Sequence, residues 1–92
     1  MHKDQAEIVA IQALGWLSGE AELFEAFLGA TGADVNDLNQ IAKNPEFLGS
    51  VLDFILMDDA SVTRFCDGAG LPYEMPMQAR QFLPGGDIPN WT

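Results

Sequence analysis

The stretch NPEFLGSVLDFILMDD, residues 44–59, constrains the fold of this chain more than any other part of it. Asn44 precedes Pro45, and a proline keeps its predecessor out of the helical region while its own fixed φ suits the first helical position. We therefore predict a helix that begins after Asn44 as its N-cap. At about 100° per residue its apolar side chains cover an arc of roughly 200°. An arc this wide predicts a central core helix at about 45–57, with neighbours on at least two sides.

The apolar arc and the polar strip of this helix are predicted residue by residue. The arc consists of Phe54, Phe47, Val51, Ile55, Leu48, Leu52 and Leu56, and the strip of Glu46, Gly49, Ser50 and Asp53. Because a membrane span needs about twenty apolar residues and this run offers about ten, we interpret it as a core helix of a globular protein. If Phe54 lies in the core, Phe54→Ala is expected to destabilise the fold by about 3–5 kcal/mol.

Helical patterns also cover the rest of the chain up to about residue 83. We expect helices at about 4–17, 20–28, 34–43, 60–67 and 77–83, while alternating strand patterns and hairpin turns are absent from the sequence. The predicted fold class is therefore all-α, a compact bundle of five to six short helices around the central apolar helix. We expect residues 1–92 to form a single helical domain, with an irregular segment rich in proline and glycine from about residue 84.

The charge of the chain excludes some classes of partner. Four Lys and Arg residues stand against fourteen Asp and Glu residues, for a formal net charge of −10. Direct nucleic-acid binding and binding to anionic membranes are not expected, because both depend on Lys and Arg. Ten of the acids fall at or near predicted first helical turns, where carboxylates cap the helix and complement its dipole: Asp4, Glu7, Glu20, Glu22, Asp34, Asp37, Glu46, Asp58, Asp59 and Glu74. The alternative to helix capping is a dedicated acidic binding face.

Cysteine usage and the N-terminus predict a cytoplasmic protein. Cys66 is the only cysteine, so the chain contains no intramolecular disulfide and gives no reason to expect an oxidising compartment. Asp4 and Glu7 occupy the region that would be basic in a secretory signal, and Gln12 interrupts the apolar run behind it. A cytoplasmic location follows by default.

No residue pattern predicts a catalytic, cofactor-binding or metal site. His2 is the only histidine and lies at the terminus, and Cys66 is expected to be a small core residue. Asp58 and Asp59 diverge in direction, and GADVNDLN lacks the glycine and the closing glutamate of a calcium loop. LPGGDIP lacks the lysine and the following helix of a phosphate-binding loop. We therefore predict no cofactor and lean against an enzyme.

The better functional candidates are apolar side chains outside the expected core. The helix at 4–17 is apolar on two sides, since Ile8 and Ile11 project away from its main apolar face. The C-terminal part contains residue types that are enriched at interfaces. The candidate interface residues are Ile8, Ile11, Tyr73, Met75, Met77 and Trp91. The alternative is that the C-terminal residues complete a small core, and we expect Ile88 or Trp91 to be docked.

Several blocks in a fixed order carry a family resemblance. They are LGWL at residues 14–17, FLGATG at 27–32, the run at 44–59, RFCDGAG at 64–70 and the late LPGG with Trp91. This order resembles an alphaproteobacterial family of short helical proteins that is catalogued as a domain of unknown function. The resemblance implies a compact helical cytoplasmic protein, and it implies no activity, cofactor or catalytic residue.

Three functions from different classes are consistent with the sequence. The first is a small acidic protein-interaction or regulatory adaptor domain, which binds an unidentified protein or a second copy of itself. The second is a small enzyme or ligand carrier with a pocket between helices, and the third is an acidic mimic of nucleic acid. A perturbed carboxylate in an unfilled apolar cavity would favour the second function, and a continuous acidic stripe the third.

Overall fold

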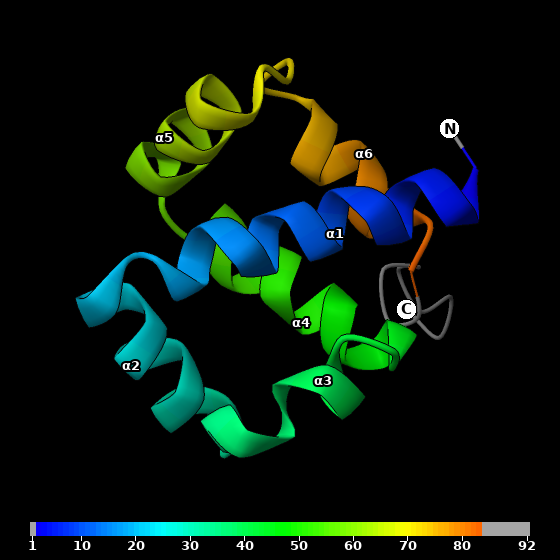
Figure 1. Cartoon of the computed structure of the whole chain (residues 1–92). Coiled ribbons are helices and arrows are strands. Elements are labelled where there is room, and N and C mark those ends of the chain that lie inside the picture. Colours follow the sequence, from blue (N-terminus) through cyan, green and yellow to red (C-terminus); the bar gives the residue numbers. More distant parts are fainter. Residues whose placement is uncertain (1, 84–92) are drawn as a thin grey trace, which may run out of the picture.

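The computed structural model describes residues 2–83 of the chain, apart from the side chains of Val35 and Ile41. Its elements are α1 (Lys3–Ser18), α2 (Ala21–Thr31), the 3-10 helix η1 (Val35–Asp37), α3 (Leu38–Ile41), α4 (Pro45–Leu56), α5 (Asp59–Ala69) and α6 (Met75–Gln81). Every regular element in the described part is helical (Figure 1), so the predicted all-α fold class is confirmed.

The central helix α4 begins as predicted. The Asn44 side-chain oxygen accepts a hydrogen bond from the Glu46 backbone N–H at 2.9 Å, and Pro45 occupies the first helical turn. The middle of the predicted apolar arc is buried, and the side chains at its edges are half-buried. The buried members are Val51, Ile55, Leu48 and Leu52, and the half-buried ones are Phe47, Phe54 and Leu56.

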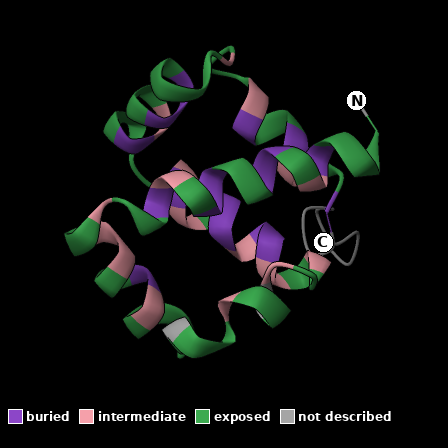
Figure 2. Cartoon of the chain, in the orientation of Figure 1, coloured by how far each residue is buried: buried purple, intermediate pink, exposed green. Residues whose placement is uncertain are grey.

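The centre of the molecule is shared between α4 and α1. Helix α1 packs mainly against α4 and α6, and it also contacts α2 and α5. The residues of its main apolar face are all buried (Figure 2): Ala6, Val9, Ala10, Ala13, Leu14 and Leu17. Three alanines in this face let neighbouring helices approach closely, because their side chains extend only one carbon from the backbone. The sequence indicated α4 as the organising helix, but the core is built around both helices.

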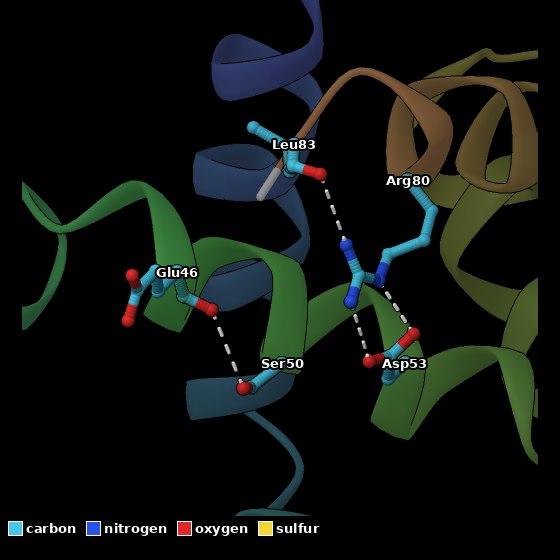
Figure 3. A network of polar contacts seen from close by, with 5 residues as sticks. All are labelled: Glu46, Ser50, Asp53, Arg80 and Leu83. Carbon is cyan, nitrogen blue, oxygen red and sulfur yellow. Dashed lines mark hydrogen bonds and ion pairs between the residues drawn. The ribbon is translucent and has the colours of Figure 1, made fainter. Parts of the chain in front are cut away.

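The predicted polar strip of α4 is partly covered by α6. Gly49 was predicted to lie on this strip, and it is buried instead. Asp53 does point to the surface, but there it accepts two hydrogen bonds from Arg80 of α6 (Figure 3), at 2.6 Å from Nε and 2.9 Å from Nη2. The strip is therefore a contact between helices as well as a solvated face.

Helix α2 adds an aromatic cluster to the core. Phe27 is fully buried, and its ring makes edge-to-face contacts with Phe47 at 5.3 Å and Phe54 at 5.4 Å between ring centroids. The helix was expected to end near Leu28, yet it continues through Gly29. It ends at Gly32, whose φ of 73° lies in the left-handed region that glycine adopts at little cost.

The third predicted helix, at residues 34–43, is much shorter than expected. A 3-10 helix precedes a single turn of α-helix, Leu38–Ile41. Asp34 accepts a hydrogen bond from the Asn36 backbone N–H at 3.0 Å, which makes a turn in place of a helical N-cap. Pro45 disfavours helical backbone at Asn44, which keeps this short helical region separate from α4.

The other helix boundaries differ from prediction by a few residues. Helix α1 is preceded by His2 at its N-cap, and not by Asp4 as predicted, since the Gln5 side chain accepts a hydrogen bond from the His2 backbone N–H at 3.1 Å. Asp58, one of the two aspartates expected as the cap of this helix, caps α5, and that helix passes through Gly68 to end at Gly70. Helix α6 begins at Met75, two residues earlier than predicted, because a proline is tolerated in a first turn.

Two predictions lie outside the described residues, namely the irregular segment from about residue 84 and the docking of Ile88 or Trp91. Within residues 2–83, none of the helices has both the length and the apolar composition needed to cross a membrane.

Candidate interaction surface

Large apolar side chains are exposed on several helices although the core beneath them is packed. In the described part of the chain every buried side-chain nitrogen and oxygen has a hydrogen-bond partner, so the core shows no polar defect. The exposed large apolar residues, with their exposed fractions, are Ile8 (55%), Ile11 (47%), Met57 (77%), Tyr73 (56%), Met77 (58%) and Phe82 (44%). Of the candidate interface residues, Ile8, Ile11, Tyr73 and Met77 therefore do not complete the core in residues 2–83.

The first groove, the α1 groove, lies between α1 and the segment that leads into α6. Its volume is about 260 Å³, and it is lined by Gln5, Ile8, Val9, Gln12, Leu71 and Met75. Ile8 and Met75 were both predicted interface residues, and the fold brings them together here. Among the described residues, the lining contains amides but no charged side chain.

The second groove, the α5–α6 groove, lies between the end of α4, the first half of α5 and the start of α6. Its volume is about 330 Å³, and it is lined by Leu56, Asp59, Val62, Thr63, Tyr73, Glu74 and Met77. The groove forms because α5 and α6 both rest on α1 and α4 and are joined by a turn at residues 70–74 (Figure 1). Its floor is apolar, and two carboxylates belong to its wall.

Tyr73 is held in a defined orientation at the edge of the α5–α6 groove. Its hydroxyl donates a hydrogen bond to Asp67 of α5 at 2.7 Å, so the turn is tied back to that helix. This hydrogen bond and the negative charge of Asp67 raise the pKa of the Tyr73 phenol. The ring is therefore positioned before any partner arrives, while more than half of its surface stays exposed.

The predicted interface residues thus divide between two sites. Ile8 and Met75 line the α1 groove, and Tyr73 and Met77 line the α5–α6 groove. Ile11 is exposed on α1 but lines neither groove, and Trp91 lies outside the described residues.

Five residues of the α5–α6 groove were not predicted as interface residues. Leu56 and Val62 were expected in the core and Asp59 and Glu74 at helix first turns, and Thr63 was not singled out. Leu56 stands at the edge of the apolar arc of α4, and such an edge position is the signal that can indicate partial exposure.

Both arginines are held in contacts within the molecule. Arg64 forms an ion pair with Glu20 and lies over the ring of Trp16, at 5.6 Å from its centroid. Arg80 pairs with Asp53, and Nη1 donates to the Leu83 carbonyl at 3.4 Å. From the sequence, Glu20 was interpreted only as a helix-start residue, and neither pair was predicted. The partners are separated by 44 positions in the first pair and by 27 in the second, so no local pattern indicates that they meet.

The candidate catalytic groups do not come together in the described residues. His2 is exposed at the start of α1, and Cys66 is buried with its Sγ 3.4 Å from the Pro72 carbonyl. Burial raises the pKa of the Cys66 thiol, and the charges of Asp67 and Glu74 raise it further. Residues 2–83 also contain no cluster of three or more His, Cys, Asp or Glu side chains suited to a metal ion.

Comparison with protein families places nearly the whole chain in one family. Residues 3–86 match the family described as "Protein of unknown function (DUF3572)", and the chain belongs to this family. The matched region includes the six α-helices of the described residues and both grooves. Neither the curated proteins nor the solved structures gave a match.

Proposed function

We propose that this member of the DUF3572 family is a small protein-interaction domain that acts as an adaptor or regulator. The observation that carries the proposal is the exposure of Ile8, Tyr73 and Met77 beside two open grooves, above a core that is already packed. Single exposed apolar residues are common on protein surfaces, but apolar residues that gather around a groove are typical of binding sites. The proposed contact residues are Ile8, Ile11, Tyr73, Met75, Met77 and Trp91.

The shape of the two grooves favours a protein partner over a small molecule. Sites for small molecules are usually concave pockets of about 300–1,000 Å³ that enclose most of the ligand. The α1 groove, at about 260 Å³, lies below that range, the α5–α6 groove, at about 330 Å³, lies near its lower limit, and both are open to solvent. They are suited to receive one or a few side chains from a larger partner.

The roles of several acids support an interaction domain over a mimic of nucleic acid. Asp58 caps α5, Asp53 pairs with Arg80, and Glu20 pairs with Arg64. These carboxylates stabilise the fold itself. They therefore account for part of the net charge without a dedicated acidic face.

We also propose a cytoplasmic location and an alphaproteobacterial source. A single buried cysteine is consistent with a reducing compartment, where thiols stay free. The source is proposed on the order of the sequence blocks from residues 14–17 to the late LPGG.

The function is tested by capture of partners from the native cell extract with the tagged chain. We expect specific proteins to bind the wild type and to be lost with Ile8→Asp, Met77→Asp or both, since a charge in an apolar contact is costly. Glu22→Gln is the control, because Glu22 is exposed and lines neither of the two apolar grooves. If the same proteins bind equally to all variants, the apolar surface is not an interaction site and the proposal is wrong.

A further inference from the structure

We infer that the α5–α6 groove binds an amphipathic helix of a partner protein, with apolar residues on one face and Lys or Arg beside them. The inference rests on the proposed interaction function and specifies its site and partner class. It is carried by the apolar floor of the groove, by the two carboxylates in its wall and by the helical construction of the surrounding surface.

The floor of the groove offers a binding site for apolar side chains. Leu56 and Val62 are half-buried and form the fixed part of the site, while Met77 is 58% exposed. Methionine is flexible and polarisable, so it adapts to the shape of an incoming side chain. Tyr73 is anchored by Asp67, so binding costs little loss of side-chain freedom at this residue.

The charges in the wall select a basic partner. Asp59 begins α5 and Glu74 precedes α6, so the two carboxylates come from different elements around one apolar floor. Within the described part of the chain, the ion pairs formed by Arg64 and Arg80 involve Glu20 and Asp53, and neither includes Asp59 or Glu74. A Lys or Arg of a partner is therefore the complementary group, and the net charge of −10 steers such a partner toward the protein.

The surrounding elements favour a helical partner over an extended one. An extended peptide usually adds to the edge of a sheet, and residues 2–83 contain no strand. Proline-rich peptides bind grooves lined by several aromatic rings, whereas this groove contains only Tyr73. The common mode that suits an apolar groove between helices is an amphipathic helix that inserts side chains at i, i+3 or i+4 and i+7.

The test uses a designed peptide, because the natural partner is unidentified. The probe is a labelled helical peptide of about 18 residues, with leucines at i, i+4 and i+7 spacing and lysines flanking them. A twin peptide has Glu in place of Lys, and a third has the same composition with the spacing scrambled. Binding to the full chain is measured by fluorescence anisotropy, and the site is mapped by amide chemical shifts.

We expect the lysine peptide to bind more tightly than both others and to shift amides around Leu56, Val62 and Met77. Met77→Ala should weaken binding by at least about fivefold, as expected for an interface residue worth more than 1 kcal/mol. Asp59→Asn together with Glu74→Gln should weaken it by about three- to tenfold. The matched control is Glu22→Gln together with Glu25→Gln, which removes the same charge from exposed positions on α2 and should change binding less than about twofold.

Three results would overturn the inference. They are equal binding of the glutamate peptide, equal weakening by the two charge-neutralised variants, or amide shifts confined to the α1 groove. The spectra of each variant also show whether it is folded. If Met77→Ala is not folded, the double variant Asp59→Asn with Glu74→Gln still tests the inference. If extract partners depend on Ile8 while the peptide ignores the α5–α6 groove, the interaction function stands and this inference falls.

Discussion

Individual core residues contribute to stability according to their place on a helix face. Leu52 lies within the buried face of α4 and is fully buried, whereas Phe54 lies at the edge of that face and is half-buried. The wide apolar arc alone did not show this difference. The earlier expectation of a loss of about 3–5 kcal/mol for Phe54→Ala assumed full burial.

The first prediction compares these two positions. Leu52→Ala is expected to lower the free energy of unfolding by about 2–5 kcal/mol, because it leaves a cavity in the shared centre of the molecule. Phe54→Ala is expected to cost less, about 1–3 kcal/mol, because part of its ring is already in contact with water. Urea unfolding monitored by circular dichroism measures both values. A larger loss of unfolding free energy for Phe54→Ala than for Leu52→Ala would contradict the placement of Phe54 at the edge of the buried face of α4.

The second prediction concerns Cys66, which is 1% exposed. Because its thiol pKa is raised, the thiolate that reacts with alkylating reagents is scarce at neutral pH. We expect alkylation of the folded protein at about pH 8 to be at least about tenfold slower than that of the urea-unfolded chain. Equal rates would show that the thiol is accessible.

The same shift in pKa gives Cys66 a stability effect with a defined sign. The pKa of the Cys66 thiol is higher in the folded protein than in the unfolded chain. Its contribution to the stability of the folded state is therefore complete at pH values below the ordinary thiol pKa. This contribution is lost as the pH rises through the raised pKa, because the unfolded chain releases its proton first. Cys66→Ser should therefore show a smaller loss of stability between neutral and alkaline pH than the wild type does.

At the scale of elements, the contact between α4 and α6 includes an arginine that forms several hydrogen bonds, Arg80. The side chain of Arg80 is 13% exposed. It forms a bidentate contact with the Asp53 carboxylate and donates a hydrogen bond to the Leu83 carbonyl. Asp53 is 56% exposed, so solvent weakens the attraction between the charges. Most of the contribution of Arg80 therefore comes from its packed stem and its hydrogen bonds.

The third prediction separates these contributions. Arg80→Ala is expected to destabilise the protein by about 1.5–3 kcal/mol, and Asp53→Asn by at most about 1 kcal/mol. Arg80→Lys should fall between them, because lysine keeps the charge but loses the two-pronged geometry. Thermal unfolding at low and high salt provides the measurement. A strong salt dependence of the Arg80→Ala effect would instead identify the charge as the main contribution.

The elements also show which parts of the fold the sequence could predict. Helix α4 was found with its cap and the middle of its buried face, since Asn44 and Pro45 are local signals. The glycines were harder to interpret, because Gly29 and Gly68 lie within helices while Gly32 and Gly70 end them. Of these four glycines, only Gly32 and Gly70 have a positive φ, and backbone angles cannot be read from the sequence.

At the scale of the whole molecule, the interaction surface was predictable in composition but not in arrangement. Exposure of Ile8 follows from its angle on α1, and it could be calculated from the sequence. The pairing of Ile8 with Met75, and of Tyr73 with Met77, depends on how α5 and α6 rest on the inner helices. No local pattern contains that information, so the sequence indicated candidate interface residues but not how they divide between two grooves.

The shared core also bears on how the molecule unfolds. Helix α1 contacts α2, α4, α5 and α6, so no large group of helices has a core of its own. The radius of gyration of 12.5 Å agrees with the value of about 13 Å expected for a compact domain of 100 residues. On this basis we propose that residues 1–92 form a single helical domain.

The fourth prediction follows from this arrangement. We expect one cooperative thermal transition, with far-ultraviolet circular dichroism for the helices and Trp16 fluorescence for the core giving the same midpoint. The fluorescence is measured in Trp91→Phe, so that Trp16 is the only tryptophan, and the calorimetric enthalpy should equal the van't Hoff enthalpy. Helix α2 gives the most demanding test of a single transition, because it has only one buried residue, Phe27. The ring of Phe27 contacts Phe47 and Phe54 of α4. The contrary result is that Phe27→Leu gives two thermal transitions, whereas Leu52→Ala gives one transition with a lower midpoint. In that case α2 folds onto a core that exists without it, and the single-domain proposal must be restricted to the helices around α1 and α4.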